Sequence, residues 1–151
     1  MTELATEYAE LLDELTCGDA EARQFLDPWW RDYCHLIDDL ADGHALPEQA
    51  VRMGALAVTL YSLPFYRRHA DRLQVVVLLV TNAFADSLEL EQRPEPYARR
   101  LASVMRHAGG DLVRAVALIC GGYDHLRRIS PRLHLLGLRD QHYTEGEEGK
   151  E

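Results

Sequence analysis

The chain has 151 residues, of which 47% are hydrophobic and 27% are charged. This length is usual for one domain with a single core, and the composition excludes a disordered or fibrous protein. The formal net charge of −9 repels phosphate backbones and anionic lipids unless the basic residues gather on one face. They are dispersed along the sequence, so we expect neither a nucleic acid nor a membrane as partner.

Residue usage also predicts where the protein works. The three cysteines show no metal-ligand spacing, which favours reduced thiols and a reducing compartment. The acidic N-terminus lacks the features of a signal peptide, and the longest apolar run, residues 75–80, is far shorter than the ~20 residues that span a bilayer. Fifteen of the 16 basic residues are arginine, as expected from a GC-rich genome. We therefore expect a cytoplasmic bacterial protein that does not span a membrane.

Apolar residues in the first third of the chain recur at helical spacing. The pattern predicts a helix over residues 3–15 and a brief helical piece that ends near residue 25. Asp27 can accept hydrogen bonds from free backbone N–H groups, and Pro28 suits the first position of a helix. A second long helix is therefore expected from this pair to Asp42, with Gly43 as its stop.

Prolines and glycines divide the rest of the chain, and no segment shows the alternation typical of a strand. The helices expected from these breaks cover 47–61, 64–91 with a possible division near Asp71, 96–109, 112–129 and a short turn at 130–136. The tail at 144–151 has nothing apolar to bury. The sequence thus predicts an all-α fold: a single-domain bundle of five to seven helices at 1–143, followed by a disordered acidic tail at 144–151.

Two of these segments are apolar on nearly every side, residues 73–90 and 112–120. Helices of this kind occupy the middle of a bundle, so both are expected to be central. The residues expected in the core from these and the 47–61 helix are Leu78, Leu79, Val116, Ile119, Val51, Leu56, Val58 and Leu60.

Three polar residues interrupt the first apolar segment. Asn82, Asp86 and Glu89 follow one another at i, i+4 and i+7, which places them on one helix face. An ionised carboxylate in a packed interior needs a cation, a metal or strong hydrogen-bond donors. One hypothesis is a divalent-metal or ligand site at Asn82 and Asp86, with Glu89 at its rim. The other is a structural pair of Asp86 with Arg114, the one charge inside the second apolar segment.

A second acidic motif, Asp38-Asp39-Leu-Ala-Asp42, has the DDxxD spacing that brings carboxylates onto one helix face. It is either a magnesium site or an exposed acidic helix end. Together with Asn82-xxx-Asp86 it resembles the acidic motifs of class I terpene synthases and of the all-α pyrophosphohydrolases of the MazG and dimeric dUTPase kind. The chain is much shorter than a terpene synthase, and it has Asp where the pyrophosphohydrolases have EExxE. The resemblance implies magnesium and a diphosphate substrate.

Two further features each allow a structural and a functional interpretation. Gly121 and Gly122 inside an expected helix destabilise it, so they indicate either close helix packing or a backbone wall for a ligand beside Tyr123. The aromatic residues near positions 29–33 and 61–66 form either core or, where exposed, a protein interface.

Two functions are consistent with these patterns. The first is a small helical binding or assembly protein that needs no cofactor and meets a protein partner or a second copy of itself. The alternative is a magnesium-dependent hydrolase of a phosphate or diphosphate bond. In that enzyme Asn82, Asp86 and some of Asp38, Asp39 and Asp42 are metal ligands, Glu89 is the base, and Arg114 stabilises the departing anion.

Overall fold

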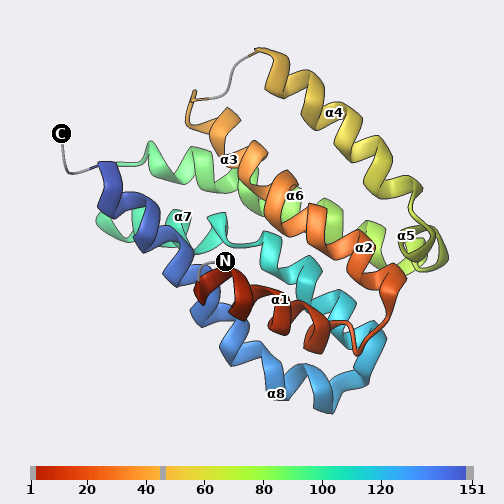
Figure 1. Cartoon of the computed structure of the whole chain (residues 1–151). Coiled ribbons are helices and arrows are strands. Elements are labelled where there is room, and N and C mark those ends of the chain that lie inside the picture. Colours follow the sequence, from red (N-terminus) through yellow and green to blue (C-terminus); the bar gives the residue numbers. More distant parts are fainter. Residues whose placement is uncertain (1–2, 45–46, 149–151) are drawn as a thin grey trace.

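The computed structural model describes residues 3–44 and 47–148, and the side chains of residues 6–44 and 47–135. This part of the chain is helical and contains no strand (Figure 1). Its elements are α1 (Glu3–Leu15), α2 (Ala20–Pro28), the π-helical turn η1 (Trp29–Tyr33), α3 (Cys34–Ala41), α4 (Pro47–Ser62), α5 (Pro64–Arg68), α6 (Ala70–Glu91), α7 (Pro96–Arg106) and α8 (Gly109–Glu148). Because α2, η1 and α3 are continuous, the described residues form seven helices, which confirms the predicted all-α bundle.

The boundaries of α1 and α2 follow from local chemistry. Cys17 and Gly18 have positive φ values of 51° and 75°, a conformation that ends an α-helix. Asp19 then caps α2, its side chain accepting hydrogen bonds from the backbone N–H groups of Glu21 and Ala22 at 2.9 and 3.0 Å. Both helices lie where the sequence predicted them, although α2 is longer than expected.

The predicted helix start at Asp27 and Pro28 is wrong. Pro28 lies inside a continuous helix, and the π turn η1 follows it directly. Proline removes one backbone hydrogen bond and crowds the preceding turn, which normally kinks or ends a helix. Here the wider hydrogen-bond spacing of η1 allows the helix to continue into α3. Asp27 and Pro28 form a pair that is typical of a helix start, but packing on both sides of the proline favours a continuous helix.

Proline marks the other boundaries as predicted. Pro64 begins α5, and α6 follows after His69, close to the expected division near Asp71. Pro96 begins α7 after the expected stop at the preceding arginine and proline. Each of these prolines occupies the first turn of its helix, where a missing N–H donor costs nothing.

The last helix differs from its prediction. Instead of a straight helix and a separate turn, α8 reverses direction at Gly122, whose φ of 77° and ψ of −177° belong to a region that is almost restricted to glycine. Figure 1 shows the two arms of α8 lying antiparallel. A Cβ at Gly121 would lie only 2.4 Å from the ring of His125. The glycine pair is therefore explained by this reversal.

The core lies between α1, α2, η1, α5 and the two arms of α8. The first arm of α8 is central, as predicted, and its Leu112, Val113, Val116 and Ala117 are buried. The predicted aromatic cluster joins this core: Trp29 stacks on Tyr33 with ring centroids 4.9 Å apart, and the Trp29 indole donates a hydrogen bond to the backbone oxygen of Gly109 at 3.3 Å. Ile119 packs against the same cluster.

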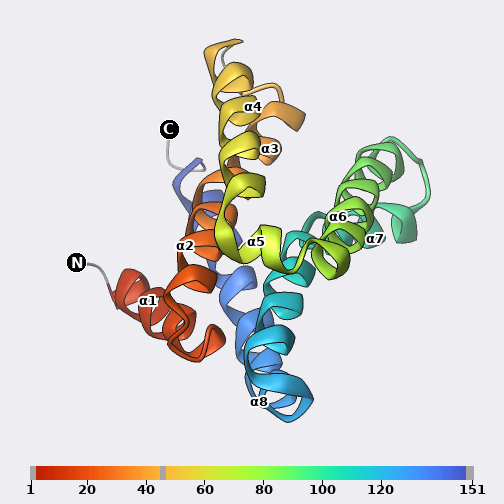
Figure 2. The same ribbon diagram turned by 90° about the vertical axis from the view of Figure 1, so that its right-hand side faces the viewer.

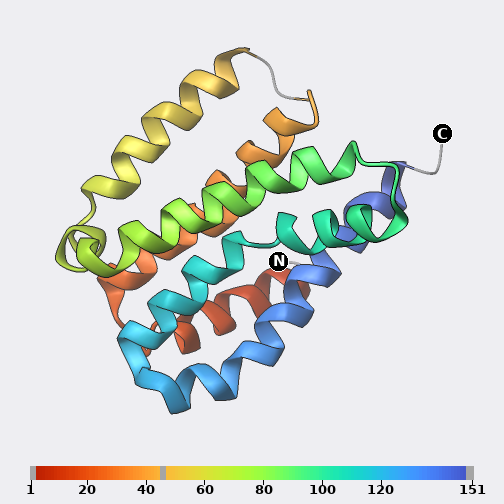
Figure 3. The same ribbon diagram turned by 180° about the vertical axis from the view of Figure 1, so that it is seen from behind.

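Two pairs of helices extend away from this core. Figure 2 shows that α3 with α4 and α6 with α7 form arms that diverge from it, and Figure 3 shows α5 at the turn that connects α4 to α6. Each arm packs mainly on its own pair, so one face of α4 and one face of α6 stay uncovered. The predictions that Val51, Val58, Leu78 and Leu79 are core residues are therefore wrong. The division into a domain at 1–143 and a disordered tail stays a prediction; α8 continues to Glu148.

Candidate functional site

The three predicted site residues of α6 lie on its uncovered face. Asn82, Asp86 and Glu89 are all exposed, so the expectation that Asp86 is shielded from water is wrong. The side-chain amide of Asn82 donates a hydrogen bond to Asp86 Oδ2 at 2.9 Å, and Glu89 accepts one from Arg93 at 2.7 Å. The buried residues of α6 are Leu73, Val80 and Ser87, which lie on another part of the helix surface than Asp86.

Arg114 does not meet Asp86, so the predicted structural pair is wrong. The Arg114 guanidinium instead forms an ion pair with Asp111 on the same helix and lies 3.2–3.3 Å from the two ring nitrogens of His134 on the second arm of α8. Burial and the adjacent Arg114 cation lower the pKa of His134 below its ordinary value. The Arg114 side chain therefore links the two arms of α8 to each other and does not link α8 to α6.

The DDxxD residues diverge in their surroundings. Asp38 and Asp42 both bind Arg106 of α7, with distances of 2.6 and 3.0 Å to its Nη1, while Asp39 is exposed. On the other side of the same guanidinium, Glu91 accepts hydrogen bonds from Nη2 at 2.6 Å and from Nε at 3.0 Å. Three carboxylates from α3 and α6 therefore surround one arginine.

Arg106 is the polar centre of this junction. Its side chain is only 11% exposed, and its guanidinium carbon lies 5.4 Å from the centre of the Phe84 ring. Burial alone would lower the pKa of Arg106, but its hydrogen bonds with Glu91, Asp38 and Asp42 outweigh that effect and raise it. No sequence pattern indicates this role of Arg106, because a single arginine in the last turn of a helix also favours the helix C-terminus and reveals no partner.

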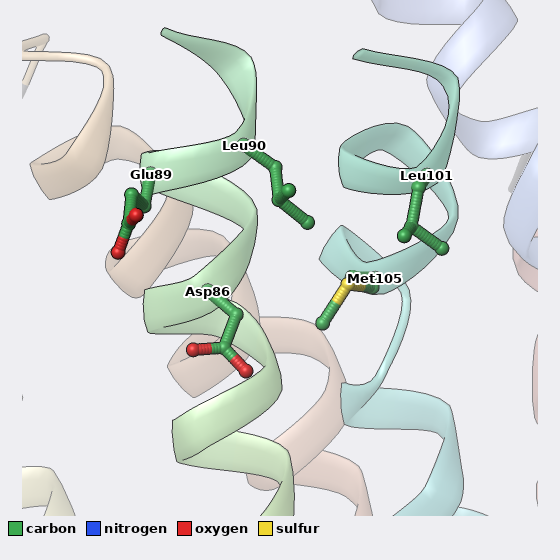
Figure 4. A pocket seen from close by; sticks show the side chains of 5 residues that line it. All are labelled: Asp86, Glu89, Leu90, Leu101 and Met105. Carbon is green, nitrogen blue, oxygen red and sulfur yellow. The ribbon is translucent and has the colours of Figure 1, made fainter. Parts of the chain in front are cut away.

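A shallow groove of about 290 Å³ lies between α6 and α7, beside Asp86. Figure 4 shows Leu90, Leu101 and Met105 pointing toward one another across it, while the Glu89 carboxylate points away from α7. Asp86 contributes the polar edge of the groove. Within the described part of the chain, no three His, Cys, Asp or Glu side chains are placed to hold a metal ion.

The uncovered face of α6 is strongly apolar. Val75, Leu78 and Leu79 are 57%, 63% and 65% exposed, in the middle of a helix of 22 residues. By length and composition, α6 is the one helix among the described residues that could cross a membrane. A monomeric protein in water rarely leaves so many large apolar side chains uncovered on one helix.

A second polar contact that no sequence pattern indicates lies between the turn that joins α1 to α2 and the second arm of α8. Cys17 Sγ lies 3.5 Å from Nε2 of the buried His125, and Arg128 donates to Nδ1 of the same ring at 3.0 Å. Because Nδ1 accepts that bond, the neutral ring carries its proton on Nε2 and donates it to the sulfur. Burial, Asp19 and Cys17 together raise the pKa of the nearby Cys120 thiol to about 11. Residues 17 and 125 are too far apart in sequence for spacing to reveal this contact.

Comparisons with known protein families, with curated proteins and with solved structures found no match to this chain.

Proposed function

We propose that this protein is an assembly protein whose α6 binds an amphipathic helix of a protein partner. The observation that carries the proposal is the exposed apolar face of α6, formed by Val75, Leu78 and Leu79. A helix packed along these side chains would remove them from water, and each fully buried leucine or valine contributes about 1.5–3 kcal/mol relative to an exposed one. Amphipathic helices commonly bind to apolar helical surfaces in this way.

The polar residues on the same face favour a protein over a lipid bilayer. Arg72 and Asp86 are both exposed on α6, and they are separated by about 21 Å along the helix axis. A hydrocarbon layer ~30 Å thick would enclose at least one of them together with Asn82. Charged side chains inside a bilayer cost several kcal/mol each, whereas a protein partner can offer them opposite charges at its rim.

A photoreactive amino acid in place of Leu78 tests this proposal. Illumination of cells that produce the variant should yield an adduct with a protein, and mass spectrometry of the linked peptide should place it on an apolar helix face. Arg127, which is exposed on α8, is the matched control position and should give no such adduct. Binding of the purified protein to vesicles without any protein adduct at position 78 would contradict the proposal.

The hydrolase alternative makes a separate prediction. A metal bound by Asn82 and Asp86 would raise the melting temperature of the wild type in magnesium through binding linkage, and Asp86→Asn would abolish the rise. We expect magnesium to leave the melting temperature of both proteins unchanged. Asp38 and Asp42, which the hydrolase hypothesis takes as further metal ligands, are already neutralised by Arg106. A magnesium-dependent rise that disappears in Asp86→Asn would favour the hydrolase instead.

A further inference from the structure

The uncovered face of α6 carries a stripe of side chains with opposite charges at its two ends. Arg72, Val75, Leu79, Asn82 and Asp86 follow one another at alternating spacings of three and four residues, and all are exposed. Spacings of three and four keep these side chains on one stripe, as in the seam of a coiled coil. Leu79 is the centre of this stripe, because Arg72 precedes it by seven residues and Asp86 follows it by seven.

The charges at the two ends of the stripe are opposite, and neither forms an ion pair within the described part of the chain. No acidic side chain among the described residues forms an ion pair with Arg72, and no cation forms one with Asp86. The amide of Asn82 bonds to Asp86 at 2.9 Å and holds its carboxylate over the end of the stripe. A surface that matches this face must therefore present an acid opposite Arg72 and a base opposite Asp86.

The order of these charges does not serve α6 itself. An isolated helix is stabilised by acids near its N-terminus and by bases near its C-terminus. In α6 the first turn contains Asp71, but the stripe itself begins with Arg72, and the last turn contains no basic residue. The distribution is explained if the ends of the stripe meet an antiparallel copy of the same helix.

We propose that the partner of α6 is a second copy of this chain, packed antiparallel about a two-fold axis at Leu79. This inference rests on the proposed assembly function and names its partner. In a two-fold interface each contact occurs twice with the roles exchanged. Leu79 thus meets Leu79 of the second copy, Val75 packs beside Asn82, and Arg72 pairs with Asp86 at both ends of the interface.

The charges also disfavour two other arrangements. A parallel pair would bring Asp86 against Asp86 and Arg72 against Arg72. An antiparallel pair centred one residue further on, at Val80, would bring Asp71 against Glu89. Juxtaposed like charges are costly at an interface, so an antiparallel pair centred on Leu79 is favoured over both.

One helix face is smaller than a stable interface, which buries ~800 Å² on each partner. The groove beside Asp86 extends the α6 face onto α7 through Leu101 and Met105. The N-terminal part of the second copy's α6 would lie over this groove. Leu101 is 49% exposed and is therefore available for such a contact.

Charge exchange tests the pairing directly. Light scattering coupled to size exclusion should show a dimer for the wild type. Arg72→Asp and Asp86→Arg each create two like-charge contacts, and each should raise the dissociation constant about tenfold or more. The double variant R72D/D86R restores both pairs and should return within about threefold of the wild type. Arg99→Asp, the same charge change at an exposed site on α7, should leave the dimer unchanged.

Cross-linking tests the axis. In a background in which the exposed Cys17 is replaced by serine, Leu79→Cys should form a disulfide between two copies, because only residues on the axis lie close to their own equivalents. Val75→Cys, also exposed, should not link to itself. Equal linking at both positions would indicate a parallel pair and overturn the inference.

Failure of self-association can be separated from failure of the assembly function. A wild type that stays monomeric at high concentration, while position 78 forms an adduct with a different protein, overturns only the second copy as partner. A monomer that gives no protein adduct at position 78 overturns both proposals.

Discussion

The helices α6 and the first arm of α8 are similar in sequence and opposite in surroundings. Both are apolar on most sides, and both were predicted to lie at the centre of the bundle. In the structure Leu112, Val113, Val116 and Ala117 of α8 are buried, whereas Val75, Leu78 and Leu79 of α6 are mostly exposed. The difference shows that an apolar helix needs a partner surface. The sequence of the helix does not specify whether the same chain or another one provides that surface.

The largest expected effect separates these two helices. Leu112→Ala should lower the free energy of unfolding by about 2–5 kcal/mol, because it opens a cavity in a filled core. Leu79→Ala, made in the Arg72→Asp background to suppress self-association, should cost less than about 0.5 kcal/mol. Urea denaturation followed by circular dichroism gives both values. Equal losses at the two sites would show that α6 is covered within the single chain.

The next effect concerns the junction that attaches the α6–α7 arm to α3. Arg106→Met keeps much of the side-chain length but leaves Asp38, Asp42 and Glu91 without their cation. Because these acids are partly exposed, the cost should be about 2–4 kcal/mol, below that of a fully buried pair. Arg93→Met removes an exposed pair with Glu89 and should cost less than about 1 kcal/mol. Equal losses of unfolding free energy in thermal melts of Arg106→Met and Arg93→Met would show that the ion pairs of Arg106 contribute no more than an exposed pair.

A smaller effect tests the reversal that makes α8 central. Gly122→Ala forces alanine into a backbone conformation of positive φ and should cost about 1–3 kcal/mol. Gly54→Ala is the matched control, since Gly54 lies inside α4 with open space where a Cβ would be. It should leave stability unchanged or raise it by up to about 1 kcal/mol. A destabilised Gly54→Ala together with a neutral Gly122→Ala would contradict the observed bend.

The smallest effect is pH dependent and lies where the two arms of α8 meet. The pKa of His134 is lowered in the fold by burial and by Arg114, so the unfolded chain binds the proton more readily. The stability that His134 contributes is present above its ordinary pKa of 6.5 and is lost as pH falls through the lowered value. The wild type should therefore lose more melting temperature than His134→Gln between about pH 7.5 and about pH 5. If the melting temperatures of the two proteins change equally with pH, His134 does not make this contribution to stability.

Most helix boundaries were predictable because their causes are local. The end of α1 depends on the turn at Cys17 and Gly18, and the starts of α5 and α7 depend on Pro64 and Pro96. The local rule failed at Pro28, where a complete start signal lies inside a continuous helix. There the π turn η1 accommodates the proline, because packing of α2 and η1 against the core outweighs one lost hydrogen bond.

The candidate site was predictable only in part. Periodicity correctly placed Asn82, Asp86 and Glu89 on one face of a helix, but it did not indicate whether that face is covered. The acidic motif at Asp38 and Asp42 was visible, whereas its partner Arg106 lies 68 and 64 residues away along the chain. No spacing rule connects residues at such a separation.

The sequence by itself therefore determined the helical class, most helix ends and the residues that share each helix face. These properties depend on hydrogen bonds and backbone preferences within a few residues. Only the tertiary structure decided that the first arm of α8 is covered while one face of α6 is not, and that Arg106 gathers carboxylates from α3 and α6. The physical reason is that the hydrophobic effect and ion pairing are satisfied by any suitable neighbour, so the path of the whole chain selects which neighbour is present.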